Sequence, residues 1–165
     1  MNKEMDAKEA LARLSAYCSV AERCRADVEE KLFRWGLDSE ARESIVLALE
    51  KDRFLDEKRY CCAFIRDKYL FARWGKVKIG QALRAKRLSP NVYEPLLDEV
   101  IDESDYLSGL RALLAAKRKT VRAANARELE GKLVRFALGR GFAMDDIHRC
   151  MDISEENELL RRKNK

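Results

Sequence analysis

The stretch that decides the fold is Phe54–Leu88, FLDEKRYCCAFIRDKYLFARWGKVKIGQALRAKRL. Gly75 divides it into two expected helices, at about 56–72 and 76–87, each with an apolar stripe at the 3.6-residue spacing. Residues 57–90 carry ten lysines and arginines against two acids, a balance of +8, with five aromatic side chains among them. A segment of this kind indicates a docking surface for a polyanion or an acidic groove. A basic helix face that is simply exposed to solvent explains the same composition equally well.

The same pattern of apolar residues recurs on both sides of this stretch. A shift of 51 places Val28 on Ile79 and Leu32 on Leu83, and a further shift of 54 places Ile79 on Leu133. We therefore predict an all-α fold of three tandem three-helix (helix-turn-helix-like) repeats that form an elongated curved array. The predicted boundaries are 9–53 for repeat 1, 54–103 for repeat 2, 104–153 for repeat 3 and 154–165 for a polar tail.

Local signals place the helices within these repeats. Gly36 is expected at the left-handed position after a helix, Asp38 or Ser39 as the N-cap of the next one, and Gly75 as an ordinary boundary glycine. The expected helices are 9–21, 25–35 and one after Asp38 in repeat 1, 56–72, 76–87 and one from Ser89-Pro90 in repeat 2, and 105–120, 125–139 and 144–151 in repeat 3. The apolar residues expected to point inward are Leu11, Leu14, Cys18 and Ala21 on the first helix, Val28, Leu32 and Trp35 on the second, Ile45, Val46 and Leu49 on the third, and Leu107, Leu110 and Leu114 on the helix at 105–120.

Charge is segregated along the chain. Residues 1–56 have a balance of −3, residues 91–110 hold six acids and no base, and residues 111–140 have a balance of +7. The bases thus gather on the first two helices of repeats 2 and 3, where they could follow a phosphate backbone or enter an anionic cleft. The candidate contact residues are Arg66, Lys68, Arg73, Lys76, Lys78, Arg84, Lys86, Arg87, Lys117, Arg118, Lys119 and Arg122. On a helical wheel Lys76, Arg84 and Arg87 fall on one face.

Catalytic, metal and cofactor patterns are missing from the sequence. The only histidine, His148, stands near Cys150 without the spacing of a metal site, and no phosphate loop or nucleophile–base pair is present. We expect no metal, no cofactor and no enzymatic activity. The five cysteines are odd in number and irregularly spaced, which predicts free thiols and a cytoplasmic location. With no apolar run of about 18 residues and no signal-like N-terminus, no membrane segment is expected.

Four segments, in order, resemble the RecX family of regulatory proteins. The first is Arg25-Ala26-Asp27-Val28 with Lys31-Leu32, and the second runs from Arg53 to Tyr60 and continues as Ala63-Phe64-Ile65-Arg66. The third is Gly75-Lys76-Val77-Lys78-Ile79 with Leu83 and Leu88, and the fourth is Lys132-Leu133, Arg135-Phe136 and Arg140-Gly141-Phe142. The resemblance covers about residues 9–151. Cys24, Phe54 and Arg87 depart from the family pattern, Arg87 by replacing a common glycine, so that its helix is expected to end differently.

This resemblance implies a non-enzymatic protein that binds the groove of the RecA filament on DNA. It further implies inhibition of the recombinase, ATPase and coprotease activities of RecA, with a role in DNA repair and the SOS response. Single- or double-stranded DNA could be contacted directly, and a monomer is expected. Two alternatives remain: a helical DNA-binding regulator that acts without RecA, and a structural helical adaptor. The third helices of the repeats are acidic, which counts against their recognising DNA bases in a sequence-specific way.

Overall fold

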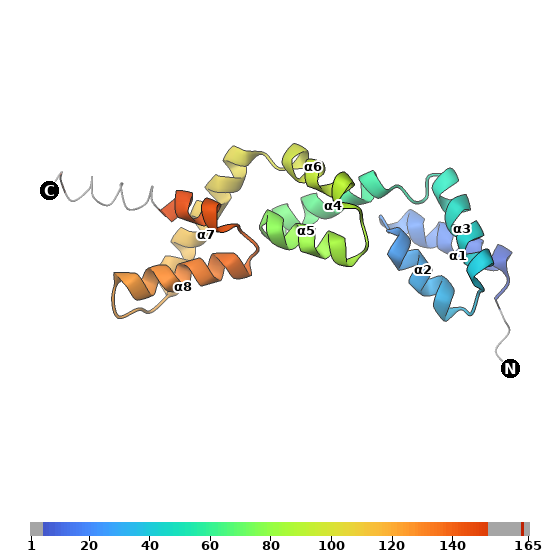
Figure 1. Cartoon of the computed structure of the whole chain (residues 1–165), viewed down its shortest axis with the longest axis horizontal. Coiled ribbons are helices and arrows are strands. Elements are labelled where there is room, and N and C mark those ends of the chain that lie inside the picture. Colours follow the sequence, from blue (N-terminus) through green and yellow to red (C-terminus); the bar gives the residue numbers. More distant parts are fainter. Residues whose placement is uncertain (1–4, 152–162, 164–165) are drawn as a thin grey trace. The chain divides into compact units, whose positions relative to one another are not determined.

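The computed structural model describes residues 5–151 and 163, and every regular element in that part of the chain is helical (Figure 1). The all-α prediction is confirmed. The helices are α1 (Ala7–Val20), α2 (Arg25–Arg34), α3 (Ser39–Lys51), α4 (Glu57–Leu70), α5 (Lys76–Ala85), α6 (Pro90–Val100), α7 (Glu103–Thr120) and α8 (Ala126–Gly139). Residues 144–151 form a further helix. The predicted tail, 154–165, lies outside the described residues except for Lys163.

Capping residues set the ends of the helices. Asp38 accepts the backbone N–H of Ala41 at 2.8 Å and starts α3, as one of the two expected caps. Helix α1 begins two residues before its predicted start because Asp6 accepts the N–H of Glu9 at 2.7 Å. Gly36 has φ +78°, the left-handed conformation expected of it after α2.

Three arginines also adopt the left-handed conformation: Arg53 (φ 61°), Arg73 (φ 55°) and Arg87 (φ 63°). The backbone at Arg87 therefore turns as a glycine would, at a cost of roughly 1 kcal/mol, and the different helix end that we expected from this substitution is not found. Helix α5 ends at Ala85, two residues before Arg87. The helical-wheel argument that joined Arg87 to Lys76 is therefore wrong for Arg87, which lies beyond the helix.

The chain packs into two compact units, each made of two segments. Of the described residues, unit 1 contains those up to Phe64 together with Ala82–Glu94, and unit 2 contains Ile65–Gln81 together with those from Pro95 onward. These units are defined by packing, whereas the three repeats were defined by sequence, so the repeat boundaries stay a prediction.

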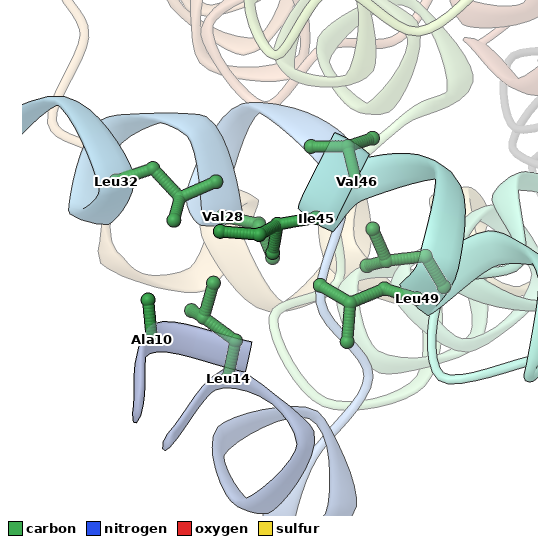
Figure 2. Packing of buried hydrophobic residues seen from close by; sticks show 8 residues of the cluster. Ala10, Leu14, Val28, Leu32, Ile45, Val46 and Leu49 are labelled. Carbon is green, nitrogen blue, oxygen red and sulfur yellow. The ribbon is translucent and has the colours of Figure 1, made fainter. Parts of the chain in front are cut away.

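The core of unit 1 brings α1, α2 and α3 together (Figure 2). The predicted inward residues Val28 and Leu32 on α2 and Ile45, Val46 and Leu49 on α3 are buried there, which confirms the helical periodicity. Leu11, Cys18 and Trp35, which were also predicted to point inward, are only partly buried against this cluster. Ala21, which we also predicted to point inward, is exposed because α1 ends at Val20. The cluster consists of Ala10, Leu14, Val28, Leu32, Ile45, Val46, Leu49 and Leu55.

Unit 2 buries apolar side chains from every helix that contributes to it. Ile65 and Ile79 come from α4 and α5, and Leu133 and Ile147 come from α8 and the last helix, all four with no exposed surface. Helix α7 contributes the predicted inward positions Leu107, Leu110 and Leu114 together with Tyr106. These buried residues hold the start of α5 and the end of α4 in place, and the candidate site is built on those two segments.

Candidate functional site

The start of α5 is packed against the turn after α8, within unit 2. A Cβ atom at Gly75 would lie 2.3 Å from both the carbonyl carbon and the oxygen of Gly141, and one at Gly141 would lie 2.2 Å from Cβ of Lys78. The N–H of Val77 donates to the Gly141 oxygen at 3.0 Å. Gly75 is therefore required by this close backbone approach, and our interpretation of it as an ordinary boundary glycine is corrected.

The other N–H groups at the start of α5 also have partners. The N–H of Gly75 donates to the carbonyl of Arg140 at 2.8 Å, and the N–H of Lys76 donates to the hydroxyl of Tyr106 at 2.9 Å. Burial raises the pKa of Tyr106 to about 12, so this hydroxyl stays protonated at neutral pH. A helix N-terminus attracts phosphate through free N–H groups, and these donors are already used within the chain.

Two of the candidate cations lie on one aromatic side chain. The ammonium groups of Lys68 and Lys78 are 4.9 Å and 4.5 Å from the ring centroid of Trp74, the range of a cation–π contact. Lys68 also lies 3.7 Å from a carboxylate oxygen of Asp67. Lys117, in the last turn of α7, makes a similar contact with another ring. Its ammonium group lies 5.0 Å from the ring centroid of Phe136.

Other candidate cations form ion pairs within their own unit. Lys76 lies 3.2 Å from Asp98 and 5.0 Å from the ring centroid of Tyr106, and only 26% of its side chain is exposed. Arg87 pairs with Glu29 at 3.0 Å in unit 1. For these residues, an intramolecular role accounts for the positive charge without any partner.

Lys86 is the most strongly engaged member of the set. Its ammonium group lies 2.7 Å from Asp27, whose carboxylate also accepts the N–H of Cys24 at 3.1 Å. Burial alone would raise the pKa of Asp27, but the hydrogen bonds from Lys86 and Cys24 outweigh it and lower the pKa below its ordinary value. The hydrogen bond that Lys86 donates to Asp27 in turn raises the pKa of Lys86 to about 12.

The remaining candidates form an exposed set without such bonds. None of them has a carboxylate within 4.0 Å among the residues that the structure describes. The exposed set consists of Arg66, Arg73, Arg84, Arg118, Lys119 and Arg122. The structure thus divides the twelve candidates into two groups. Six form ion pairs or cation–π contacts within the chain, and the other six, the exposed set, have no carboxylate within 4.0 Å among the described residues. Lys76 and Arg84, which share α5, belong to different groups and different units.

A pocket of about 170 Å³ in unit 2 was not anticipated from the sequence. It lies between the end of α4, the following loop, α7 and the turn after α8. Beside it, Leu70 is 58% and Phe71 81% exposed, which is high for large apolar side chains. The sequence feature that could have indicated this apolar surface is the pair Leu70-Phe71 at the end of a predicted helix. The lining residues are Tyr69, Leu70, Arg73, Trp74, Tyr106, Gly109, Leu110, Leu113 and Phe142.

Metal-binding and membrane-spanning features are lacking within residues 5–151 and 163. No three His, Cys, Asp or Glu side chains there are grouped to hold a metal ion. No helix in the same part of the chain has the length and apolarity to cross a membrane. All five cysteines are free thiols, and burial raises the pKa of Cys61 to about 12, which makes it a poor nucleophile.

Comparison with known proteins gives the same family for two consecutive segments of the chain. Residues 56–94 match the second three-helix domain of RecX, and residues 103–151 match the third. Together these matches cover more than half of the 165 residues. The chain belongs to the RecX family.

Individual RecX proteins agree with this assignment. The regulatory protein RecX of Herminiimonas arsenicoxydans is 27% identical over 147 residues, covering 89% of this chain and 93% of that protein. The RecX of Clostridium botulinum (strain Alaska E43 / Type E3) is 33% identical over 125 residues, covering 73% of this chain and 56% of that protein.

Two crystal structures share the fold. That of a regulatory protein RecX superimposes with a TM-score of 0.81 and covers 88% of this chain and 73% of its own. The RecX structure from Lactobacillus salivarius gives a TM-score of 0.78 and covers 88% of this chain and 94% of its own. Both are 20% identical to this chain, so this similarity supports the fold alone.

Proposed function

We propose that this chain is a non-enzymatic regulator that binds the RecA filament on DNA and inhibits the recombinase, ATPase and coprotease activities of RecA. The observation that carries the proposal is membership of the RecX family, whose matched relatives are named regulatory proteins. The RecA partner comes from the family resemblance and not from the geometry. We place this function in the cytoplasm, where thiols stay reduced.

The exposed set supports a binding function of this kind. Arg66 and Arg73 lie on and after α4, while Arg118, Lys119 and Arg122 lie at the end of α7 and in the loop that follows. Guanidinium and ammonium groups without intramolecular acids retain their full attraction for carboxylates of RecA or phosphates of DNA. We propose these residues as the first contacts, with Lys76, Lys86 and Arg87 acting mainly within the fold.

An alternative is direct DNA binding without RecA, because the same exposed cations suit phosphate. Sequence-specific reading is disfavoured by α6, which carries Glu94, Asp98 and Glu99 and no base. Fluorescence anisotropy with a labelled single-stranded oligonucleotide separates the two functions. We expect tight binding at physiological salt only when RecA and a non-hydrolysable ATP analogue have formed a filament on the oligonucleotide. Equal affinity for naked DNA and for the filament would favour the alternative.

A further inference from the structure

The pocket of unit 2 combines an apolar wall with a cationic rim. Leu110 and Leu113 of α7 supply aliphatic surface, and the rings of Tyr106 and Phe142, with centroids 5.2 Å apart, supply aromatic surface. Its volume of about 170 Å³ suits a single side chain of moderate size. The exposed surfaces of Leu70 and Phe71 extend the apolar area beyond the pocket itself.

Charge is divided between the two ends of this pocket. At the Trp74 end, Arg73 is the only charged residue in the lining, and Lys68 and Lys78 lie on the Trp74 ring. At the Tyr69 end, burial raises the pKa of the phenol, and the neighbouring carboxylates of Asp105 and Asp102 raise it further. Asp102 is already used as the N-cap of α7. Arg73, which has no carboxylate within 4.0 Å among the described residues, therefore places positive charge at the Trp74 end of the pocket, while the carboxylates of Asp102 and Asp105 lie by Tyr69.

An apolar side chain of a protein suits this pocket better than a nucleobase. A base would gain by stacking on Trp74, but two ammonium groups already lie within 5 Å of that ring's centroid. The leucines and the exposed Leu70-Phe71 pair offer contact to aliphatic and phenyl groups, for which a base with its polar edges is a poor match. A carboxylate next to such a side chain would meet Arg73.

We propose that this pocket binds one apolar side chain of moderate size from an acidic segment of a partner protein. The apolar group would occupy the space between α7 and the Trp74 loop, and the flanking carboxylates would pair with Arg73 and with Lys78. This proposal adds a binding site for a partner protein to the proposed function. It rests on that function only in taking RecA as the protein that carries the acidic segment.

Gly109 allows the pocket to be filled without disturbing the fold. It lines the pocket from α7, and a Cβ atom added there would meet no atom within 4 Å. Gly109→Leu should therefore occupy the pocket and leave the melting temperature unchanged or higher, since glycine disfavours a helix interior. Gly131→Leu is the matched control, because Gly131 is also inside a helix, outside the pocket, and its added Cβ would meet only Arg135 Nη1 at 3.9 Å.

The test uses the full chain labelled with ¹⁵N and two short synthetic peptides. One has a phenylalanine flanked on each side by Asp and Glu, and the other has the same phenylalanine flanked by Lys and Arg. The acidic peptide should shift the indole N–H of Trp74 and the amide of Gly109, and bind at least tenfold more tightly than the basic one. Gly109→Leu should abolish the shift of the Trp74 indole N–H, and Gly131→Leu should retain both shifts.

The proposal is overturned if the acidic peptide gives no shifts at millimolar concentration, or if the basic peptide binds equally well. It is also overturned if an oligothymidylate shifts these signals and the acidic peptide does not, because the pocket would then take a nucleotide. Binding of the variants to RecA filaments is measured in parallel. If the wild-type chain does not bind RecA filaments, the proposed function is wrong. If the Gly109→Leu variant binds the filaments as tightly as the wild type does, the pocket is not the site at which RecA docks.

Discussion

The backbones of Gly75 and Gly141 approach so closely that a methyl group on Gly75 would lie 2.3 Å from the Gly141 carbonyl. This contact joins the loop before α5 to the turn after α8, segments 66 residues apart in the sequence, and three N–H groups at the start of α5 have partners around it. Arg140 strengthens the junction because its guanidinium donates to the carbonyl of Ala72 at 2.8 Å. The loop that carries Trp74 and lines the pocket is thereby held at both of its ends.

Gly75→Ala should destabilise the protein by about 1–3 kcal/mol, because backbone must move to admit the methyl group. Urea unfolding monitored by circular dichroism measures the change. Gly139→Ala is the control, since a Cβ atom there meets nothing within 4 Å, and it should leave the free energy of unfolding unchanged or slightly higher. Equal stability of the Gly75→Ala variant and the wild type would show that the two backbones are not in contact.

Lys86→Met should destabilise unit 1 by about 1 kcal/mol, because Asp27 would lose its partner in a half-buried position. Arg84→Met, two residues away, removes an exposed charge that has no carboxylate within 4.0 Å among the described residues, and should cost less than about 0.5 kcal/mol. Chemical unfolding of both variants gives the comparison. Equal losses of unfolding free energy in the two variants would mean that the ion pair of Lys86 does not stabilise the fold. Lys86 would then again be a candidate for direct contact with a partner.

Stability should fall in acid through Asp27. Its pKa is lowered in the folded state, so its contribution is complete above the ordinary value of 3.8 and is lost as the pH falls through the folded pKa. Asp27→Asn should reduce stability at pH 7 and flatten the acid limb of the stability curve. Thermal melts between pH 2 and pH 7 provide the test, and an acid limb as steep as that of the wild type would assign the effect to other carboxylates.

Charge reversal at Arg118 and Lys119 should weaken filament binding several-fold and reduce its dependence on salt, because each lost phosphate contact removes counterion release. The reversal of Lys8 and Lys51 changes the net charge equally, on exposed positions of α1 and α3, and should have the smaller effect. Anisotropy titrations at several salt concentrations measure both. If the two double variants weaken binding alike, only net charge matters and the α7 end is not a contact.

Periodicity and capping residues were sufficient to predict most of the fold. The inward positions Val28 and Leu32 and the cap Asp38 follow from local rules, and they are found as expected. The contact between Gly75 and Gly141 could not be predicted, because it depends on which segments meet in space and not on local conformation. The same reason separates Lys86 from Arg84: the sequence gives both the same charge, and only the fold places Asp27 beside one of them.

Regulation of RecA by this chain, as proposed, should appear in the rate of ATP hydrolysis by RecA on single-stranded DNA. Titration of the chain into preformed filaments should lower the rate progressively up to a one-to-one ratio to RecA. An unchanged rate of hydrolysis at stoichiometric amounts of well-folded wild-type protein would contradict the proposed function.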